Sequence, residues 1–293
     1  MEQSFLTTFA YAKINLALAV LAIREDGYHE LQSVMQSISL HDIVRIRRCG
    51  EKLVCRSGAL SGPGNLAYKA AALYLEYCGL SDGIEIEIEK HIPIQAGLAG
   101  GSTDAAATFR LLNYLYKKPL DDEGLLGLAE KCGADVAFCL RGGTVWTTGR
   151  GERLELLPAA PEMDLVLIKP LAGVNTGEAY LRFDLLGQGG SLNKAEWKKA
   201  LSQGSAEQIA KLLYNDLEPA SIQIVPEILT IKQLLLEAGC YGALMSGSGS
   251  SVFGIAQDKE HALKVAGQLK KRGYKYVWVT KTVLNAVNSL SKS

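Results

Sequence analysis

The stretch Pro93-Ile94-Gln95-Ala96-Gly97-Leu98-Ala99-Gly100-Gly101-Ser102-Thr103-Asp104-Ala105-Ala106 joins an alternating segment, 84–89, to a segment with helical spacing, 104–116. We expect a glycine loop between a strand and a helix. Glycines let backbone N–H groups approach a ligand closely, and a helix N-terminus carries partial positive charge. The pattern predicts an anion site suited to phosphates, where Ser102 and Thr103 offer hydroxyls to a phosphate oxygen or a magnesium ion. No Gly-Lys-Ser/Thr follows, so it is not a Walker loop. The alternative is a mobile glycine linker before a capped helix.

The composition is that of a globular protein large enough for one large or two ordinary domains. The 293 residues include 31 Lys+Arg, 31 Asp+Glu and 48% hydrophobic residues. The formal net charge of zero argues against bulk nucleic-acid binding, which depends on a basic surplus, so we expect no nucleic-acid partner. The 30 glycines do not indicate disorder, because hydrophobic residues are abundant, and we interpret them as local turn and loop residues.

Nothing near the N-terminus resembles a membrane span or a signal peptide. The apolar run 16–23 is far shorter than the roughly 20 residues of a membrane span, and Glu2 is the only charge before Lys13. We expect a cytoplasmic protein with no membrane partner. The six cysteines form no Cys-x-x-Cys pair and the four histidines are scattered, so we expect reduced thiols and no zinc held by the protein.

Hydrophobic periodicity predicts an α+β protein. We expect strands at 9–23, 31–40, 42–48, 84–89, 144–148, 152–157, 164–169 and 276–283, with a turn at His41-Asp42. We expect helices at 66–77 behind Asn65, at 104–116 capped by Ser102 or Thr103, and at 123–132, 206–213, 227–237 and 261–272. The composition shifts at Pro158-Ala159-Ala160-Pro161, so we place the two domains at residues 1–160 and 161–293.

Several further features allow more than one interpretation. Residues 62–67 formally match a dinucleotide fingerprint, but Pro63 lacks an N–H, and a turn before an Asn-capped helix is the better interpretation. The glycine-serine loop in 244–253 fits a ligand contact or a plain tight turn. Lys13 interrupts an apolar strand and, if buried, needs an acidic partner. Asp135 fits a turn or helix cap, and Tyr28-His29 fit a turn.

Three segments taken in order resemble the GHMP superfamily of small-molecule kinases, which includes galactokinase, homoserine kinase, mevalonate kinase and phosphomevalonate kinase. They are 12–16 (Ala-Lys-Ile-Asn-Leu), 97–106 and 245–253. With 26–31 (Asp-Gly-Tyr-His-Glu-Leu) and 133–138 (Gly-Ala-Asp-Val-Ala-Phe), the resemblance covers nearly the whole chain. It extends to the branch that phosphorylates a cytidine-diphosphate-linked sugar alcohol in the non-mevalonate route to isoprenoid precursors. It implies an N-terminal phosphate-loop domain, a C-terminal ferredoxin-like domain, ATP and Mg²⁺ as cofactors, and transfer to the substrate's 2-hydroxyl.

The resemblance also implies roles for single residues. Lys13 and Asp135 match the catalytic pair: Asp135 would orient or deprotonate the hydroxyl, and Lys13 would keep Asp135 ionised and stabilise transition-state charge. The residues implied at ATP are Pro93, Ile94, Gln95, Ala96, Gly97, Leu98, Ala99, Gly100, Gly101, Ser102 and Thr103, with Asn65 and Lys90 as nucleoside contacts and Ser102 as a candidate for Mg²⁺. At the substrate, Tyr28 and Tyr180 would stack the cytosine, Asn15 and His29 would read its edge or the polyol end, and Gly247, Ser248 and Gly249 would close over it.

Two positions depart from the family's phosphate loop, which commonly reads Gly-Leu-Gly-Gly-Gly-Ser-Ser. Alanine at positive φ costs on the order of 1 kcal/mol, so we predict that Ala99 has negative φ. Thr103 keeps a hydroxyl, and the assignment of Tyr180 depends on a small gap in 171–180. Two alternatives compete with this interpretation. A homoserine or mevalonate type of kinase would need no stacking platform such as Tyr28-His29, and a non-catalytic nucleotide-binding module would need no aspartate base.

Overall fold

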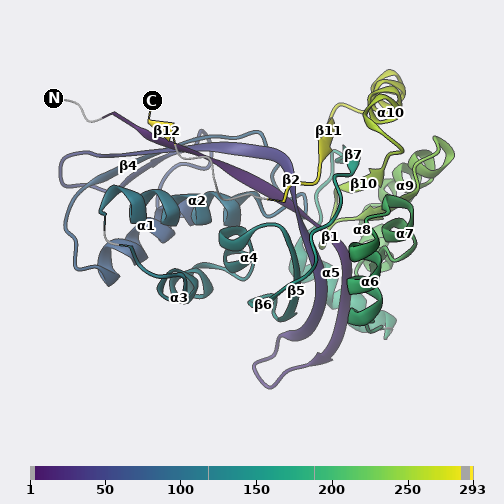
Figure 1. The fold of residues 1–293 in the computed structure, drawn as a ribbon, viewed down its shortest axis with the longest axis horizontal. Helices are drawn as coiled ribbons and strands as arrows, with labels where there is room; N and C mark the ends of the chain where they lie inside the picture. Colours follow the sequence, from purple (N-terminus) through teal and green to yellow (C-terminus); the bar gives the residue numbers. More distant parts are fainter. Residues whose placement is uncertain (1–3, 118, 188, 285–290, 293) are drawn as a thin grey trace.

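Two long paired strands form the centre of the molecule (Figure 1). The computed structural model describes residues 4–117, 119–187, 189–284 and 291–292. In it, β1 (Leu6–Ile23) pairs antiparallel with β2 (His29–Arg48) along most of its length. Buried and half-buried residues alternate in the first part of β1, whereas residues 12–20 are all buried. The strand pair therefore starts as one layer of a half-covered sheet and continues between the two halves of the molecule.

The first sheet carries four helices on one face. Its described strands follow the order β12-β1-β2-β4-β3, while β5 and β6 extend from β2, and β8 pairs with β1. Their bounds are β3 (Val54–Arg56), β4 (Ile84–Glu89), β5 (Thr144–Gly149), β6 (Arg153–Leu156), β8 (Tyr214–Asn215) and β12 (Ser291–Lys292). The helices, which lie on the left of Figure 1, are α1 (Leu66–Tyr77), α2 (Gly100–Leu115), α3 (Asp122–Cys132) and α4 (Val136–Arg141). They enclose a core that includes Ile46, Ile86, Tyr74 and Phe109.

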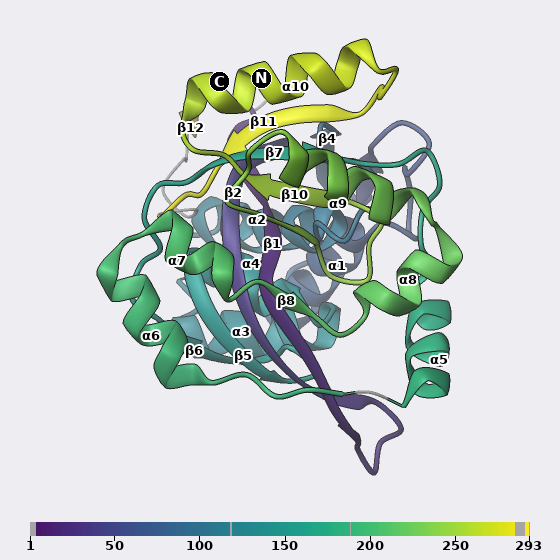
Figure 2. The ribbon, with the colours of Figure 1, turned by 90° about the vertical axis from the view of Figure 1, so that its right-hand side faces the viewer.

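The second sheet has the ferredoxin-like order. Its four strands are β7 (Asp164–Ile168), β9 (Gly242–Met245), β10 (Val252–Ile255) and β11 (Val277–Lys281), in the antiparallel order β11-β7-β10-β9. The helices of this half are α5 (Thr176–Leu186), α6 (Lys194–Gln203), α7 (Ala206–Lys211), α8 (Glu218–Ile224), α9 (Glu227–Glu237) and α10 (Lys259–Lys271). Helices α9 and α10 pack on the strands, and Figure 2 faces this half. The α+β class and the ferredoxin-like arrangement are confirmed.

A third apolar cluster joins the two sheets. It combines Ile14 and Ile38 of the long strands with Leu98 from the glycine loop and with Leu167 and Phe253 of the second sheet. Each of these side chains is at most 1% exposed. The first sheet also receives β8 and β12 from beyond residue 160. The boundary between residues 160 and 161 stays a prediction.

Most predicted elements are present, and the exceptions have physical causes. The helix at 66–77 and the strand at 84–89 match residue for residue, and the Asn65 side chain accepts from the Ala67 N–H as a cap. The prediction of a turn at His41-Asp42 was wrong, because both residues lie within the continuous strand β2. The register of β1 and β2 shifts between Tyr11 and Lys13, and that irregularity interrupts the alternation as a turn would. Helices α4, α5, α6 and α8 were not predicted.

Candidate active site

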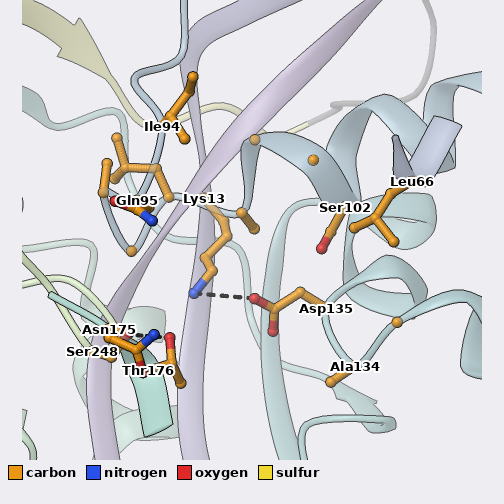
Figure 3. Close-up of a pocket in the computed structure, with 18 of the residues that line it drawn as sticks. Lys13, Leu66, Ile94, Gln95, Ser102, Ala134, Asp135, Asn175, Thr176 and Ser248 are labelled. Carbon is orange, nitrogen blue, oxygen red and sulfur yellow. Dashed lines mark hydrogen bonds and ion pairs between the residues drawn. The ribbon is translucent and has the colours of Figure 1, made fainter. Parts of the chain in front are cut away.

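A cavity of about 1580 Å³ opens between the two halves (Figure 3). Its lining comes from β1, the start of β2, the glycine loop before α2, helix α5 and the glycine-serine loop between β9 and β10. Of the residues proposed from the sequence, Thr103 is the one that does not line this cavity. The candidate site is therefore a single space assembled from segments that are distant in sequence.

Lys13 and Asp135 point toward one another inside this cavity (Figure 3). Lys13 Nζ lies 3.5 Å from Asp135 Oδ2, and the Lys13 residue is only 4% exposed. Asp135 precedes α4 at the N-cap position, yet its carboxylate makes no capping hydrogen bond. The interpretation of Asp135 as a simple helix cap is therefore wrong, and its carboxylate is left to face Lys13 and the cavity. A buried lysine needs such a partner, because an uncompensated charge in the interior is costly.

Asn15 holds the other side of Lys13. Lys13 Nζ donates to Asn15 Oδ1 over 2.7 Å, and the Asn15 amide donates to Ser33 Oγ over 2.8 Å. Asn15 is 1% exposed and lines the cavity. These contacts make Asn15 a positioning residue for the lysine, and its predicted contact with substrate stays a prediction.

The glycine loop ends in a helix N-terminus that has no side-chain cap. Ala99 is the N-cap of α2, with φ 57° and ψ 30°, so the prediction of negative φ at this position was wrong. Gln95, with φ 52°, is the other non-glycine residue of the loop with a left-handed backbone. The Ala99 Cβ packs against the first core, which offsets part of the conformational cost. Since alanine supplies no oxygen, the backbone N–H groups of the first turn remain available for an anion in the cavity.

The helix start also corrects the expected capping residues. Helix α2 begins at Gly100, so Ser102 and Thr103 lie inside its first turn. Thr103 is 1% exposed and donates its hydroxyl to the Tyr11 backbone oxygen over 2.6 Å. Its hydroxyl therefore faces β1 and not the cavity, contrary to its expected role at phosphate. Ser102 lines the cavity, and Figure 3 shows its side chain on the Asp135 side.

Gly97 packs tightly against the glycine-serine loop of the second half. A Cβ built on Gly97 would lie 2.0 Å from the Ser246 backbone oxygen, and the residue has φ 72°. Ser246 Oγ donates to the Gly97 backbone oxygen over 2.9 Å. The glycine-serine loop is therefore not a plain tight turn, because it packs directly against the glycine loop. Ser248 beyond it shares a 2.9 Å hydrogen bond with Thr176 at the start of α5.

Lys90 lies beneath the glycine loop between two aspartates. Its Nζ contacts Asp42 Oδ2 at 2.5 Å and Asp104 Oδ2 at 2.7 Å. Asp42 also accepts hydrogen bonds from the backbone N–H groups of His91 and Ile92, so its carboxylate has more hydrogen-bond donors than that of Asp104. Burial raises the pKa of Asp104 to about 8; the Lys90 charge opposes this shift and the Asp42 charge adds to it. Lys90 is thereby a support of the loop, and its predicted nucleoside contact stays a prediction.

Three aromatic side chains, Tyr28, His29 and Tyr180, line the cavity. The rings of His29 and Tyr180 stack with centroids 5.1 Å apart at an interplanar angle of 23°. Tyr28 is 58% exposed, and the Arg150 guanidinium lies 5.1 Å from its ring centroid. The structure thus places all three aromatic residues proposed from the sequence in the lining of the cavity. Burial raises the pKa of Tyr180, and the Asp135 charge adds to this effect, so its hydroxyl stays protonated.

Several residues of the site were missed by the sequence interpretation. Asp184 contacts His29 from α5, and Asn175 caps that helix by accepting from the Glu178 N–H. Asn175 before an apolar pattern is a cap signal that would have revealed this helix. Nothing in the Gly149-Arg150-Gly151 turn distinguishes Arg150 from an ordinary surface arginine. The described residues contain no group of three or more His, Cys, Asp or Glu side chains suited to a metal ion.

Comparisons with known families agree with this arrangement. A family model for the GHMP kinases N terminal domain matches residues 65–143, and a model for the GHMP kinases C terminal matches residues 197–275. The chain belongs to the GHMP kinase family. It is therefore an ATP-dependent small-molecule kinase. The glycine loop and Asp135 lie within the matched N-terminal domain, and Lys13 precedes it in the chain.

Individual relatives of this kinase share one name. A protein of Desulfitobacterium hafniense (strain Y51), "4-diphosphocytidyl-2-C-methyl-D-erythritol kinase", is 56% identical over 94% of this chain and 95% of its own. A protein of the same name from Pelotomaculum thermopropionicum is 45% identical over 94% and 98%. A crystal structure of 4-(cytidine 5'-diphospho)-2C-methyl-D-erythritol kinase superposes with a TM-score of 0.82 at 37% identity, covering 94% of this chain and 98% of that one. A homoserine kinase from Cytophaga hutchinsonii, at 22% identity and a TM-score of 0.75 over 99% and 98% of the chains, shares the fold.

Proposed function

We propose that this kinase transfers the γ-phosphoryl group of ATP to the 2-hydroxyl of 4-diphosphocytidyl-2-C-methyl-D-erythritol, a step toward isoprenoid precursors. The observation that carries the proposal is the aromatic lining of the cavity, since Tyr28, His29 and Tyr180 line the same space as Lys13 and Asp135. A nucleobase needs flat apolar faces and a polar edge, whereas homoserine or mevalonate needs neither. The shared name of relatives at 56% and 45% identity supports the same substrate.

In this proposal, Asp135 receives the proton of the 2-hydroxyl as that oxygen bonds to the γ-phosphorus and the bond to the ADP oxygen breaks. Lys13, held by Asn15 and Asp135, pairs with the Asp135 carboxylate and offsets charge that develops on the transferring group. Phosphoryl transfer has a loose transition state with spread charge, so positioning and electrostatics supply most of the catalysis. The glycine loop supplies the remaining positive potential through its uncapped helix N-terminus.

The donor set of the cavity also fits a magnesium ion that arrives with ATP. Mg²⁺ commonly keeps several waters and is held by substrate phosphates with one or two protein oxygens. Ser102, whose side chain lines the cavity near Asp135, is the residue we assign to it. When bound, the ion would neutralise phosphate charge. The reaction is proposed to occur in the cytoplasm without a nucleic-acid or membrane partner. Among the described residues, none of the helices combines the length and the apolar character of a membrane-spanning segment.

The test is a coupled assay of ADP release with three acceptors offered separately. We expect turnover with 4-diphosphocytidyl-2-C-methyl-D-erythritol and little with homoserine or mevalonate. Phosphorus NMR of the product should show a new phosphomonoester while the diphosphate signals persist. Preference for either of the other two acceptors, or no turnover with the first, would refute the assignment.

A further inference from the structure

The contact between His29 and Asp184, which both line the cavity, fixes one edge of the imidazole. His29 Nε2 lies 2.7 Å from Asp184 Oδ1. The ring is also held by its stack on Tyr180 and by an edge contact with Phe183, whose ring centroid lies 6.0 Å away. Tyr180, Phe183 and Asp184 occupy one side of α5 at helical spacing, so a single helix face holds the ring in place. The His29 side chain is 11% exposed.

The hydrogen-bond chemistry then decides the protonation of the ring. An ionised carboxylate only accepts hydrogen bonds, so Nε2 must carry the hydrogen that faces Asp184. Neutral imidazole has one N–H donor and one acceptor nitrogen, which leaves Nδ1 as an acceptor. Among the described residues, Nδ1 of His29 has no hydrogen-bond partner, and His29 lines the cavity. The ring therefore offers its acceptor to a donor from a bound ligand.

We propose that Asp184 is a positioning residue that holds His29 in the Nε2–H tautomer and thereby selects cytosine over uracil. This inference rests on the proposed function, since it assigns the base of that substrate. The exocyclic amino group of cytosine donates hydrogen bonds, whereas the oxygen at the same place in uracil only accepts them. Nδ1, as an acceptor, can receive a hydrogen bond from the amino group of cytosine. With uracil bound, Nδ1 and the uracil oxygen would both be acceptors, and no hydrogen bond could form between them. Sites built on a hydrogen bond discriminate strongly against analogues that leave a buried polar group unpaired.

The variant Asp184→Asn removes the constraint with little change in shape. An amide can donate or accept, so the imidazole of the variant can adopt either tautomer and suit either base. We measure kcat/KM for the cytidine substrate and for its uridine diphosphate analogue. We expect the wild type to prefer cytidine by about 100-fold or more, and Asp184→Asn to reduce that ratio at least about tenfold. The matched control is Glu178→Gln, an exposed carboxylate of the same helix outside the cavity lining, which should keep the wild-type ratio.

A merely structural role for Asp184 would lower both kcat/KM values together and leave their ratio unchanged, and that result would overturn the proposal. A second measurement needs no variant of Asp184. In ¹⁵N NMR spectra of the wild type, with the His29 signals assigned by loss in His29→Gln, Nε2 should be protonated and Nδ1 unprotonated at pH 7.5. Protonation at Nδ1, alone or with Nε2, would also overturn it. Failure of the wild type to phosphorylate the cytidine substrate would instead refute the proposed function, while the nitrogen signals would still decide how Asp184 holds His29.

Discussion

Asp135 stands where a helix-capping aspartate would, but its carboxylate contacts Lys13 and faces the cavity. Removing its charge with Asp135→Asn should lower kcat by about 10²- to 10⁴-fold, the usual contribution of a general base. ATP affinity should stay within a few-fold, because the glycine loop and the α2 N-terminus are untouched. Steady-state kinetics and nucleotide titration check both expectations. The exposed Asp122→Asn on α3 serves as control, and a near-normal kcat in Asp135→Asn would place the base elsewhere.

Ala99 shows how a single residue can escape prediction from sequence. Alanine rarely adopts positive φ, so negative φ was the reasonable expectation, yet the loop requires a left-handed residue there. We expect Ala99→Gly to change the free energy of unfolding by less than about 0.5 kcal/mol, because relief of strain is opposed by lost Cβ packing and a more flexible unfolded chain. Ala99→Val should lower it by about 1–3 kcal/mol. Urea unfolding of both variants measures this. Equal destabilisation by the two would contradict a left-handed residue 99.

At the scale of elements, the first turn of α2 depends on the charges beneath it. One ammonium, Lys90, pairs with two buried carboxylates, and Asp104 lacks the backbone donors from which Asp42 accepts. Burial would lower the pKa of Lys90, but the Asp104 and Asp42 charges outweigh burial and raise it. Lys90 thus ties the first turn of α2, directly after the glycine loop, to β2.

This arrangement gives the stability of the protein a definite pH dependence. The pKa of Asp104 is raised from 3.8 to about 8 in the folded protein, so between these values the folded state holds more protons than the unfolded state. The unfolding free energy therefore falls as the pH rises through that window. Asp104→Asn removes this loss, so its stability relative to wild type should increase from pH 5 to pH 8, by up to about 1 kcal/mol per pH unit. Urea titrations at several pH values test this; a difference that stays constant from pH 5 to pH 8 would show that Asp104 is ionised in the folded protein.

The elements differ in how far their sequence determines them. The helix 66–77 was predictable because Asn65 caps it and its apolar residues recur at helical spacing. Strand β2 was divided in two because the register shift opposite Lys13 arises from pairing with β1, which periodicity in one segment does not contain. Helix α4 has only six residues, too few to show a period, although it places Asp135.

At the scale of the whole molecule, the site exists only through contacts distant in sequence. Gly97 and Ser246 touch, and Lys13 meets Asp135, because the third apolar cluster holds the two sheets together. Local patterns indicated which residues carry chemistry, and the family resemblance indicated their roles. The His29–Asp184 contact and the Lys90 support depend on packing between elements, so neither could be inferred from spacing.

The shared third cluster predicts that both halves unfold together. Leu167 is completely buried in it, so Leu167→Ala should lower the unfolding free energy by about 2–5 kcal/mol. The control Leu263→Ala, on α10 and 55% exposed, should change it by less than about 0.5 kcal/mol. Proteins with several domains often unfold in steps. Here, unfolding of one half alone would expose the shared apolar cluster on the half that is still folded. Circular dichroism and tryptophan fluorescence should therefore give one coincident transition in wild type and in both variants. Two separated transitions, with only one moved by Leu167→Ala, would show that the halves are stable without each other.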